Sequence, residues 1–243
     1  MNVLLVTSEL GVDGGGLALT SLQLTTILEK CGCQVKIENS LVHNEYLALD
    51  GGYDPELGKK IRYAVHLKSC AEKYSQDFLP DILIAYGAGA NGYFAHLLAA
   101  KLKRKFFVVL CGSEINISFA SAALSFYNRT VITRAQRVIG LSQELLDNAK
   151  LFDDNFGDSK YFLVPNAYDF SRVPDFGREK FLERQIVFAS GSTYLSEKKG
   201  IANLIKAFSI YLKKSERNDI LRLYGKIDTD IRVQYQKLIK ENH

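Results

Sequence analysis

The N-terminal stretch Asn2-Val3-Leu4-Leu5-Val6 is a short apolar run, and Gly14-Gly15-Gly16 follow it just before an amphipathic segment at residues 17–29. A short run without polar alternation is typical of a strand that is covered on both faces. In residues 17–29, apolar side chains recur on one helical stripe. The stretch therefore predicts a buried strand, a glycine loop and a helix, which together open an α/β domain.

The same alternation continues through the first two thirds of the chain. Apolar runs occupy residues 3–6, 35–37, 82–85, 106–110, 137–140 and 161–164. Helix-length segments lie between them, at residues 17–29, 59–74, 93–102, 117–134 and 143–151. Strands that alternate with helices favour a parallel, doubly wound sheet. We therefore predict an α/β fold with a Rossmann-like N-terminal domain at residues 1–169.

A second unit begins after a charged segment that shows no clear period. Residues 170–183 form the predicted linker, which contains Pro174 and Gly177. Beyond it, residues 184–243 contain two predicted strands, 186–189 and 220–224, and two predicted helices, 197–214 and 230–240. Two strands do not complete a doubly wound sheet, so we expect these residues to be the opening of an incomplete second Rossmann-like domain.

Composition excludes several classes of protein. The 243 residues are 47% apolar and 24% charged, with 31 Lys and Arg against 27 Asp and Glu and a formal net charge of +4. This balance argues against a strongly basic nucleic-acid arm and an acidic disordered tail, so no nucleic-acid partner is expected. No apolar run approaches the ~20 residues that span a bilayer, and the N-terminus lacks the pattern of a secretory signal. We expect a cytoplasmic protein whose four cysteines form no disulfide framework.

Two basic clusters suggest contact with a membrane surface. They are Lys101, Lys103, Arg104 and Lys105 at one predicted helix end, and Lys59, Lys60 and Arg62 at the start of another. Such residues add ~1 kcal/mol each at an anionic surface. The alternative is that both clusters are solvated helix ends. The first interpretation predicts a peripheral contact at the inner face of the membrane.

The glycine loop is the first candidate site. Glycines before a helix let the backbone approach a ligand, and the helix N-terminus favours an anion such as phosphate. The alternative is a tight turn that needs positive φ. The loop lacks the dinucleotide spacing G-x-G-x-x-G, because Leu19 stands where the third glycine would fall if Gly14 were the first. A nicotinamide-dependent dehydrogenase is therefore disfavoured.

Three further segments lie at strand ends or at the start of a helix. Cys111-Gly112-Ser113-Glu114 ends a strand, where open α/β sheets bind ligands, and Ser113 and Glu114 could hydrogen-bond a polyol. The alternative there is a strand-to-helix turn capped by Ser113 or Asn116. Asn166 suits a sugar hydroxyl or a phosphate, or else begins an Asx turn. In Lys198-Lys199-Gly200 a lysine can meet a diphosphate, or the pair can be a solvated turn.

No segment predicts a metal site. Asp228-Thr229-Asp230 matches a D-x-D pattern, but it lies at the start of a charged helix, where Asp is a good N-cap. Cys31 and Cys33 lack the second pair that a zinc site needs and are predicted to be small core residues. His43, His66 and His96 are scattered along the chain.

In order and spacing, these segments resemble the retaining glycosyltransferases of the GT-B fold, most closely family 4 (group 1). The resemblance covers nearly the whole chain. It rests on Gly14-Gly15-Gly16, Cys111-Gly112-Ser113-Glu114, Ala135-Gln136-Arg137-Val138-Ile139-Gly140-Leu141-Ser142, Val164-Pro165-Asn166-Ala167-Tyr168-Asp169, residues 191–200 and Leu204-Ile205-Lys206-Ala207-Phe208.

The resemblance implies two Rossmann domains, with the acceptor mostly on the first and the nucleotide sugar on the second. It implies no metal and no cofactor, and it assigns no catalytic residue. By position, Gly15 and Gly16 would approach the donor, and Lys199 with Lys198 would take the diphosphate. Asn166 would line the cleft as a donor-binding residue, and the stretch Cys111-Gly112-Ser113-Glu114 would line the substrate cleft.

Departures from the family pattern put donor binding in doubt. Members often have His where Cys111 stands and Gly-Arg where Gly191-Ser192 stands, and the family's Glu pair in the donor domain has no counterpart before His243. We expect an enzyme that transfers a hexose from a nucleotide-diphosphate sugar to a saccharide or lipid-linked acceptor with retention, in cell-surface polysaccharide synthesis. The alternative is a non-catalytic sugar- or nucleotide-binding module, or one half of a split glycosyltransferase.

Overall fold

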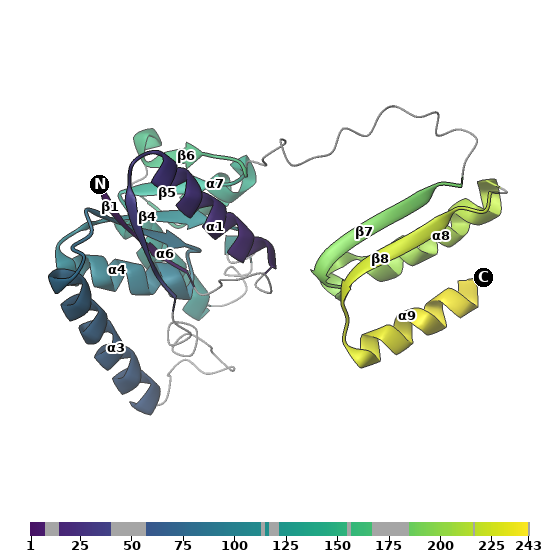
Figure 1. Cartoon of the computed structure of the whole chain (residues 1–243), viewed down its shortest axis with the longest axis horizontal. Helices are drawn as coiled ribbons and strands as arrows, with labels where there is room; N and C mark the ends of the chain where they lie inside the picture. Colours follow the sequence, from purple (N-terminus) through teal and green to yellow (C-terminus); the bar gives the residue numbers. More distant parts are fainter. Residues whose placement is uncertain are drawn as a thin grey trace. The chain divides into compact units, whose positions relative to one another are not determined.

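The computed structural model describes residues 1–7, 15–39, 57–112, 115–116, 122–154, 157–166, 185–215 and 217–242. It confirms the predicted α/β class, with one six-stranded and one two-stranded sheet (Figure 1). The chain divides into two compact units, Met1–Tyr168 (unit 1) and Asp169–His243 (unit 2). Among the described residues, none of the helices combines the length and hydropathy that crossing a membrane requires.

Unit 1 is built on the six-stranded sheet. Its strands are β1 (Asn2–Val6), β2 (Gln34–Glu38), β3 (Ile82–Tyr86), β4 (Lys105–Leu110), β5 (Arg137–Gly140) and β6 (Tyr161–Leu163). Their order is β2-β1-β3-β4-β5-β6, and every neighbouring pair is parallel. The strand order reverses between β1 and β3, because the chain continues from β1 to one side of the sheet and from β3 to the other.

Helices cover both faces of this sheet. They are α1 (Gly15–Lys30), α3 (Leu57–Gln76), α4 (Ala90–Leu102), α6 (Ala122–Arg134) and α7 (Gln143–Lys150). Val3 and Leu5 belong to a core that includes α1, whereas Leu4 and Val6 belong to a larger core with α3, α4, α6 and α7. Alternate side chains of β1 thus enter two apolar cores, which explains why its run shows no polar alternation, whereas the edge strand β2 alternates polar and apolar residues.

One local prediction in unit 1 is corrected, and another is tested only in part. The helix predicted at 117–134 is described only from Ala122, with residues 117–121 outside the described part. Cys31 is exposed rather than a core residue, because α1 ends at Lys30 and Cys31 lies in the turn with Gly32, whose φ is +79°. Cys33 is half-buried and packs against the core on the α1 side.

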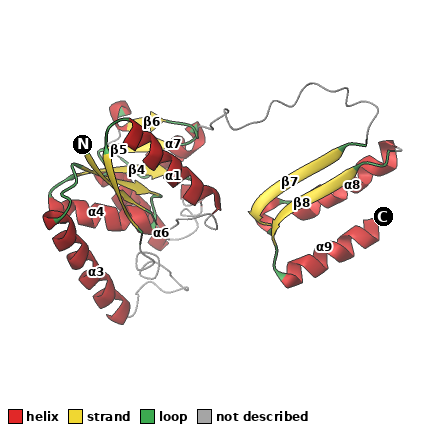
Figure 2. Ribbon diagram, viewed as in Figure 1, coloured by secondary structure: helices red, strands yellow, loops and turns green. Residues whose placement is uncertain are grey.

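Unit 2 contains β7 (Val187–Tyr194), the 3-10 turn η5 (Glu197–Lys199), α8 (Ile201–Ser215), β8 (Ile220–Lys226) and α9 (Thr229–Asn242) (Figure 2). The two strands pair in parallel, from Val187 with Ile220 onward. β7 runs well past its predicted end at residue 189, so Gly191 and Ser192 lie inside the strand. The cause is continued pairing with β8, where Gly191 faces Tyr224 before an irregularity in register.

The apolar core of unit 2 is much smaller than that of unit 1. Its fully buried members are Leu195, Ile201, Ile205 and Tyr235. On β7, Phe188 packs edge-on against Phe208 and Tyr211 of α8 yet remains 40% exposed. Burial of apolar surface is the main source of folding free energy, so the smaller core of unit 2 stabilises that unit less than the core of unit 1 stabilises unit 1.

Candidate functional site

The carboxyl edge of the unit 1 sheet collects most of the predicted site residues. All six strands are parallel, so their C-terminal ends meet at one edge. Gly15 and Gly16 follow β1, Cys111 and Gly112 follow β4, and Asn166 follows β6. Ligands of open α/β sheets bind at such an edge, where the strand order reverses. β1 borders that point, β4 is one strand away, and β6 lies further along the sheet.

The glycines after β1 form the first turn of α1. The helix begins at Gly15, no acidic residue lies in its first turn, and Gly16 is exposed. A β-carbon on Gly16 would meet nothing within 4 Å. None of the described residues covers Gly16, and the start of α1 carries the N–H groups that a helix leaves without intrahelical partners. Gly14 lies outside the described residues.

The end of β4 is a tight exit from the sheet. Cys111 is half-buried, and its Sγ donates to the carbonyl of Val109 at 3.4 Å. Gly112 has φ +154°, which disfavours any other residue, and a β-carbon there would meet nothing within 4 Å. The polyol role assigned to Ser113 and Glu114 stays a prediction, because both residues lie outside the described part.

Asn166 lies exposed just beyond β6. The chain before it is held to the sheet by the amide of Val164, which donates to the carbonyl of Gly140 at 3.0 Å. Residues 167–184 lie outside the described part. Both interpretations of Asn166, as a ligand contact or as the start of an Asx turn, stay open.

The lysine pair of unit 2 lies in η5, one turn before α8. This corrects the prediction of one continuous helix over 197–214. Gly200 adopts φ +66° and separates η5 from α8, and its amide donates to the carbonyl of Glu197 at 2.9 Å. Lys199 is exposed, whereas the side chain of Lys198 lies outside the described part.

A hollow of about 360 Å³ lies beside this turn, between the start of α8 and α9. Its lining comprises Glu197, Gly200, Ala202, Asn203, Lys206, Gln234, Tyr235 and Leu238. The hydroxyl of Tyr235 is buried there and has no hydrogen-bond partner among the described residues. Nothing in the sequence pattern pointed to Tyr235, because its place in the hollow depends on how α9 packs.

A second glycine run was missed, although its spacing is visible in the sequence. Gly87-Ala88-Gly89-Ala90-Asn91-Gly92 reads G-x-G-x-x-G and lies between β3 and α4, at the point where the strand order reverses. Gly87 has φ +103°. A β-carbon on Gly92 would lie 2.8 Å from Cγ1 of Val131 on α6. The first glycine thus allows a turn, as it does in nucleotide-binding folds with this spacing. Gly92, inside the first turn of α4, allows that helix to pack closely against α6.

The fold also brings together three side chains that the sequence analysis kept apart. Glu38 ends β2, while His66 and Cys70 lie one turn apart on α3, and their ligand atoms lie within 4.8 Å of one another. His66 is therefore not an isolated histidine. The spacing of four residues within a predicted helix was a signal for the His66–Cys70 pair, but nothing in the sequence brought Glu38 to it.

Comparison with known proteins identifies the type of fold that the whole chain shares with solved structures. No protein-family model and no curated protein matches it. Among solved structures, UDP-GlcNAc 2-epimerase from Neisseria meningitidis, bound to UDP-GlcNAc, matches with TM-score 0.63 at 14% identity, over 100% of this chain and 70% of that one. HepE from Anabaena, in complex with UDP and glucose, matches with TM-score 0.60 at 15% identity, over 100% and 65%.

A third match is UDP-GlcNAc 2-epimerase from Methanocaldococcus jannaschii, with TM-score 0.60 at 14% identity, over 99% of this chain and 70% of that one. The chain spans about two thirds of the length of the solved structures that it matches. At these identities the likeness establishes the fold alone. The chain has the GT-B type of α/β fold that these proteins share.

Proposed function

We propose that this chain is a sugar-nucleotide glycosyltransferase of the GT-B fold, similar to family 4, which transfers a hexose with retention to a saccharide or lipid-linked acceptor. The observation that carries the proposal is the combination of this fold with open glycine turns at two strand-to-helix connections. One is the start of α1 in unit 1, and the other is the turn before α8 in unit 2. HepE and the Neisseria epimerase, which share the fold, hold UDP or UDP-sugars in their structures.

In this proposal, unit 1 (residues 1–169 in our prediction) binds the acceptor and unit 2 (residues 184–243) binds the donor. Lys199, with Lys198 beside it, takes the diphosphate as it leaves. Gly15 and Gly16 allow close approach of the donor. A positive charge that is already in place where negative charge develops lowers the barrier without moving at the moment of reaction. Asn166 contributes to binding of the donor, and the residues after β4 line the substrate cleft.

Binding of UDP to the full chain tests the donor site. Loss of a hydrogen bond to a charged group costs about 1.5–3 kcal/mol, or about 10- to 100-fold in affinity. We expect Lys199→Ala to weaken UDP binding by that factor in calorimetry. Lys213→Ala is the matched control, because Lys213 lies in the last turn of the same unit's α8. Equal UDP affinities of the two variants would show that Lys199 does not bind the diphosphate.

A second candidate function is epimerisation of a UDP-sugar, which the matches to UDP-GlcNAc 2-epimerases favour. The two reactions leave different products. A transferase releases free UDP and lengthens an acceptor, whereas an epimerase inverts C2 of the sugar. Incubation with a panel of UDP-sugars, with and without saccharide acceptors, separates them by chromatography. A non-catalytic module or one half of a split enzyme would bind UDP and change none of the sugars when assayed alone.

A peripheral membrane contact would place a lipid-linked acceptor near the site. Lys101, Lys103, Arg104 and Lys105 are all exposed, but they lie at the start of β4, the opposite edge of the sheet from the glycine turns. The start of α3, with Lys60 and Arg62, follows β2 and is the basic cluster nearer the carboxyl edge. We expect flotation with anionic liposomes that Arg62→Glu reduces. Flotation that does not depend on anionic lipid would contradict the proposal.

A further inference from the structure

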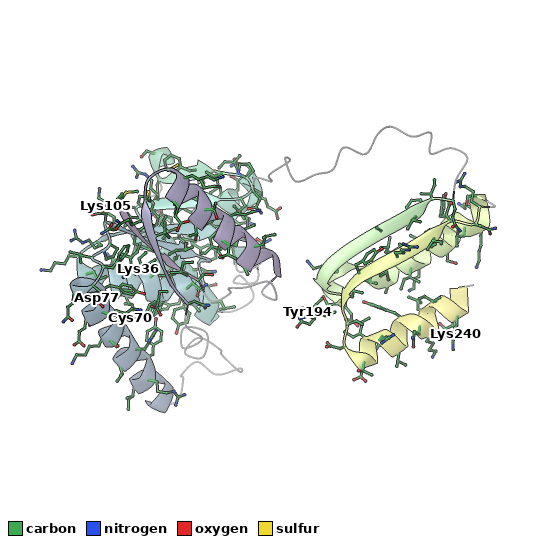
Figure 3. The ribbon with its side chains drawn as sticks, viewed as in Figure 1. Lys36, Cys70, Asp77, Lys105, Tyr194 and Lys240 are labelled. Carbon is green, nitrogen blue, oxygen red and sulfur yellow. The ribbon has the colours of Figure 1, made fainter. Side chains whose placement is uncertain are left out.

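Glu38, His66 and Cys70 form a compact cluster on the outer side of unit 1. Glu38 is the last residue of the edge strand β2 and is 6% exposed. His66 and Cys70 lie on the face of α3 that packs toward the sheet, where Cys70 is 4% exposed (Figure 3 labels Cys70). The imidazole, the thiol and the carboxylate come from two separate elements and face one another.

The spacing of the three groups matches the edges of a tetrahedral metal site. Sγ of Cys70 lies 3.6 Å from Nε2 and 3.8 Å from Nδ1 of His66. Nε2 of His66 lies 3.5 Å from Oε1 of Glu38. Zinc–ligand bonds of 2.0–2.3 Å at tetrahedral angles place sulfur and nitrogen about 3.6 Å apart, and nitrogen and oxygen about 3.4 Å apart. Sγ is nearly equidistant from the two ring nitrogens and so lies over the face of the imidazole. A single ion therefore contacts all three atoms after a rotation of the His66 or Cys70 side chain that turns the Nε2 lone pair and the thiolate toward one point.

Neighbouring side chains hold the cluster in place. The hydroxyl of Tyr74 donates to Oε2 of Glu38 at 2.7 Å, which leaves Oε1 for His66. The ring of His66 stacks on Phe94, with 5.2 Å between centroids and 24° between planes. Outer partners that orient ligands in this way are a regular feature of protein metal sites. Tyr74 is 1% exposed, so its hydroxyl is fixed by packing.

We propose that Cys70, His66 and Glu38 bind a divalent transition-metal ion, with zinc as the best fit to a thiolate, imidazole and carboxylate set. Three protein ligands leave a fourth position for water, and the His66 side chain is 22% exposed. The thiolate and the carboxylate together balance the charge of the ion. The metal ties α3 to the edge strand β2.

Two features set the conditions for binding. Burial, and next the nearby Glu38, raise the pKa of the Cys70 thiol to about 12, so the ion must displace the thiol proton to solvent. Nζ of Lys73 lies 3.8 Å from Oε2 of Glu38 and competes with a cation for this carboxylate. The Lys73 side chain is 55% exposed and can turn to water. Lys73 and Tyr74 both contact Oε2 of this carboxylate.

Cobalt(II) titration of the chelator-treated full chain tests the proposal. We expect uptake of one ion, with a sulfur-to-cobalt charge-transfer band, and displacement of the cobalt by zinc. Cys70→Ser should abolish the charge-transfer band, and His66→Gln should weaken zinc binding at least as much as the 10- to 100-fold typical of outer-partner mutations. Cys31→Ser is the matched control, because Cys31 is an exposed cysteine outside the cluster, and it should bind like the wild type.

Lys73→Met gives a readout that packing alone does not produce. The substitution removes the cation that competes for Glu38 and should tighten zinc binding. In the absence of added metal, it should lower the stability of the protein or leave it unchanged. A wild-type chain that gives no charge-transfer band would overturn the proposal. So would a band that persists in Cys70→Ser and disappears in Cys31→Ser. Circular dichroism of each variant confirms that it is folded before titration.

Discussion

Gly225 is the residue of unit 2 whose replacement should lower the stability of that unit most. It lies in β8 with φ +153°, a conformation that is essentially restricted to glycine. A β-carbon there would collide with the carbonyl oxygen of Ser192 in β7 and would lie 3.1 Å from Cγ of Leu195. The φ alone costs about 1–3 kcal/mol, and overpacking adds about 1–3 kcal/mol. We expect Gly225→Ala to destabilise unit 2 by about 3 kcal/mol or more.

That cost is large for a unit of this size, whose free energy of unfolding is about 4–11 kcal/mol. Hydrogen exchange measures it: 3 kcal/mol corresponds to about 100-fold faster exchange of the β7 and β8 amides, with β4 of unit 1 unchanged. The matched control is Gly191→Ala in the paired strand, where a β-carbon meets nothing within 4 Å. Equal exchange rates of the β7 and β8 amides in the two variants would show that Gly225 is not needed for the close contact between β7 and β8.

Three further outcomes follow from packing and charge. Amides of residues 186–189 should exchange well before those of residues 106–110 in the intact chain, because three residues of Val187–Ser190 are exposed whereas most of β4 is buried; equal protection contradicts this. A hydrogen bond from Arg217 lowers the pKa of Asp219 to about 2 from 3.8. The ionised carboxylate therefore stabilises the fold fully above about pH 4, and this contribution is lost as pH falls toward 2. The urea midpoint of unit 2 should fall over that pH range in the wild type and should depend less on pH in Asp219→Asn. Ser142 caps α7 by accepting from the amide of Leu145 at 3.3 Å, so Ser142→Ala should cost unit 1 about 1 kcal/mol in urea unfolding.

The fold of unit 1 could be predicted because its central strands β1, β3 and β4 are buried on both faces, and their runs are almost entirely apolar. The edge strand β2 instead alternates polar and apolar residues over Gln34–Glu38, and its place follows from its position between two helical segments. Strand β7 was harder. Its apolar part ends near Ala189, but the strand continues through Gly191 and Ser192 because β8 supplies backbone partners. The break between η5 and α8 was also missed, because it depends on the left-handed conformation of Gly200.

Part of the candidate site could likewise be predicted from the sequence, and part could not. Gly15, Gly16, Cys111 and Gly112 follow from their positions after strands, which a parallel sheet brings to one edge. The cluster of Glu38 with His66 and Cys70 does not follow, since β2 and α3 lie far apart in the sequence and only packing orients the Glu38 side chain toward the helix. The glycine run at residues 87–92 is visible in the sequence by its G-x-G-x-x-G spacing after the apolar run 82–85.

The register of unit 2 links its stability to its proposed function. The pairing of β7 with β8 shifts between Gly191 and Tyr194 (labelled in Figure 3), and the amide of Leu195 then donates to the carbonyl of Lys226 at 2.8 Å. This bond fixes where the chain leaves the sheet, and the turn that carries Lys199 begins at the next residue, with the Lys199 amide donating to the carbonyl of Ser196.

If Lys199 binds the diphosphate, an alanine at Gly225 should therefore weaken UDP binding beyond the loss of folded protein. The measurement is calorimetry at a temperature where exchange shows the variant to be mostly folded, with affinity corrected for the folded fraction. We expect a weakening of about 10-fold relative to Gly191→Ala, because a lysine displaced from its ligand loses most of a charged hydrogen bond. Equal corrected affinities would mean that the turn holds Lys199 without help from the strand pairing, and the link between register and binding would fail.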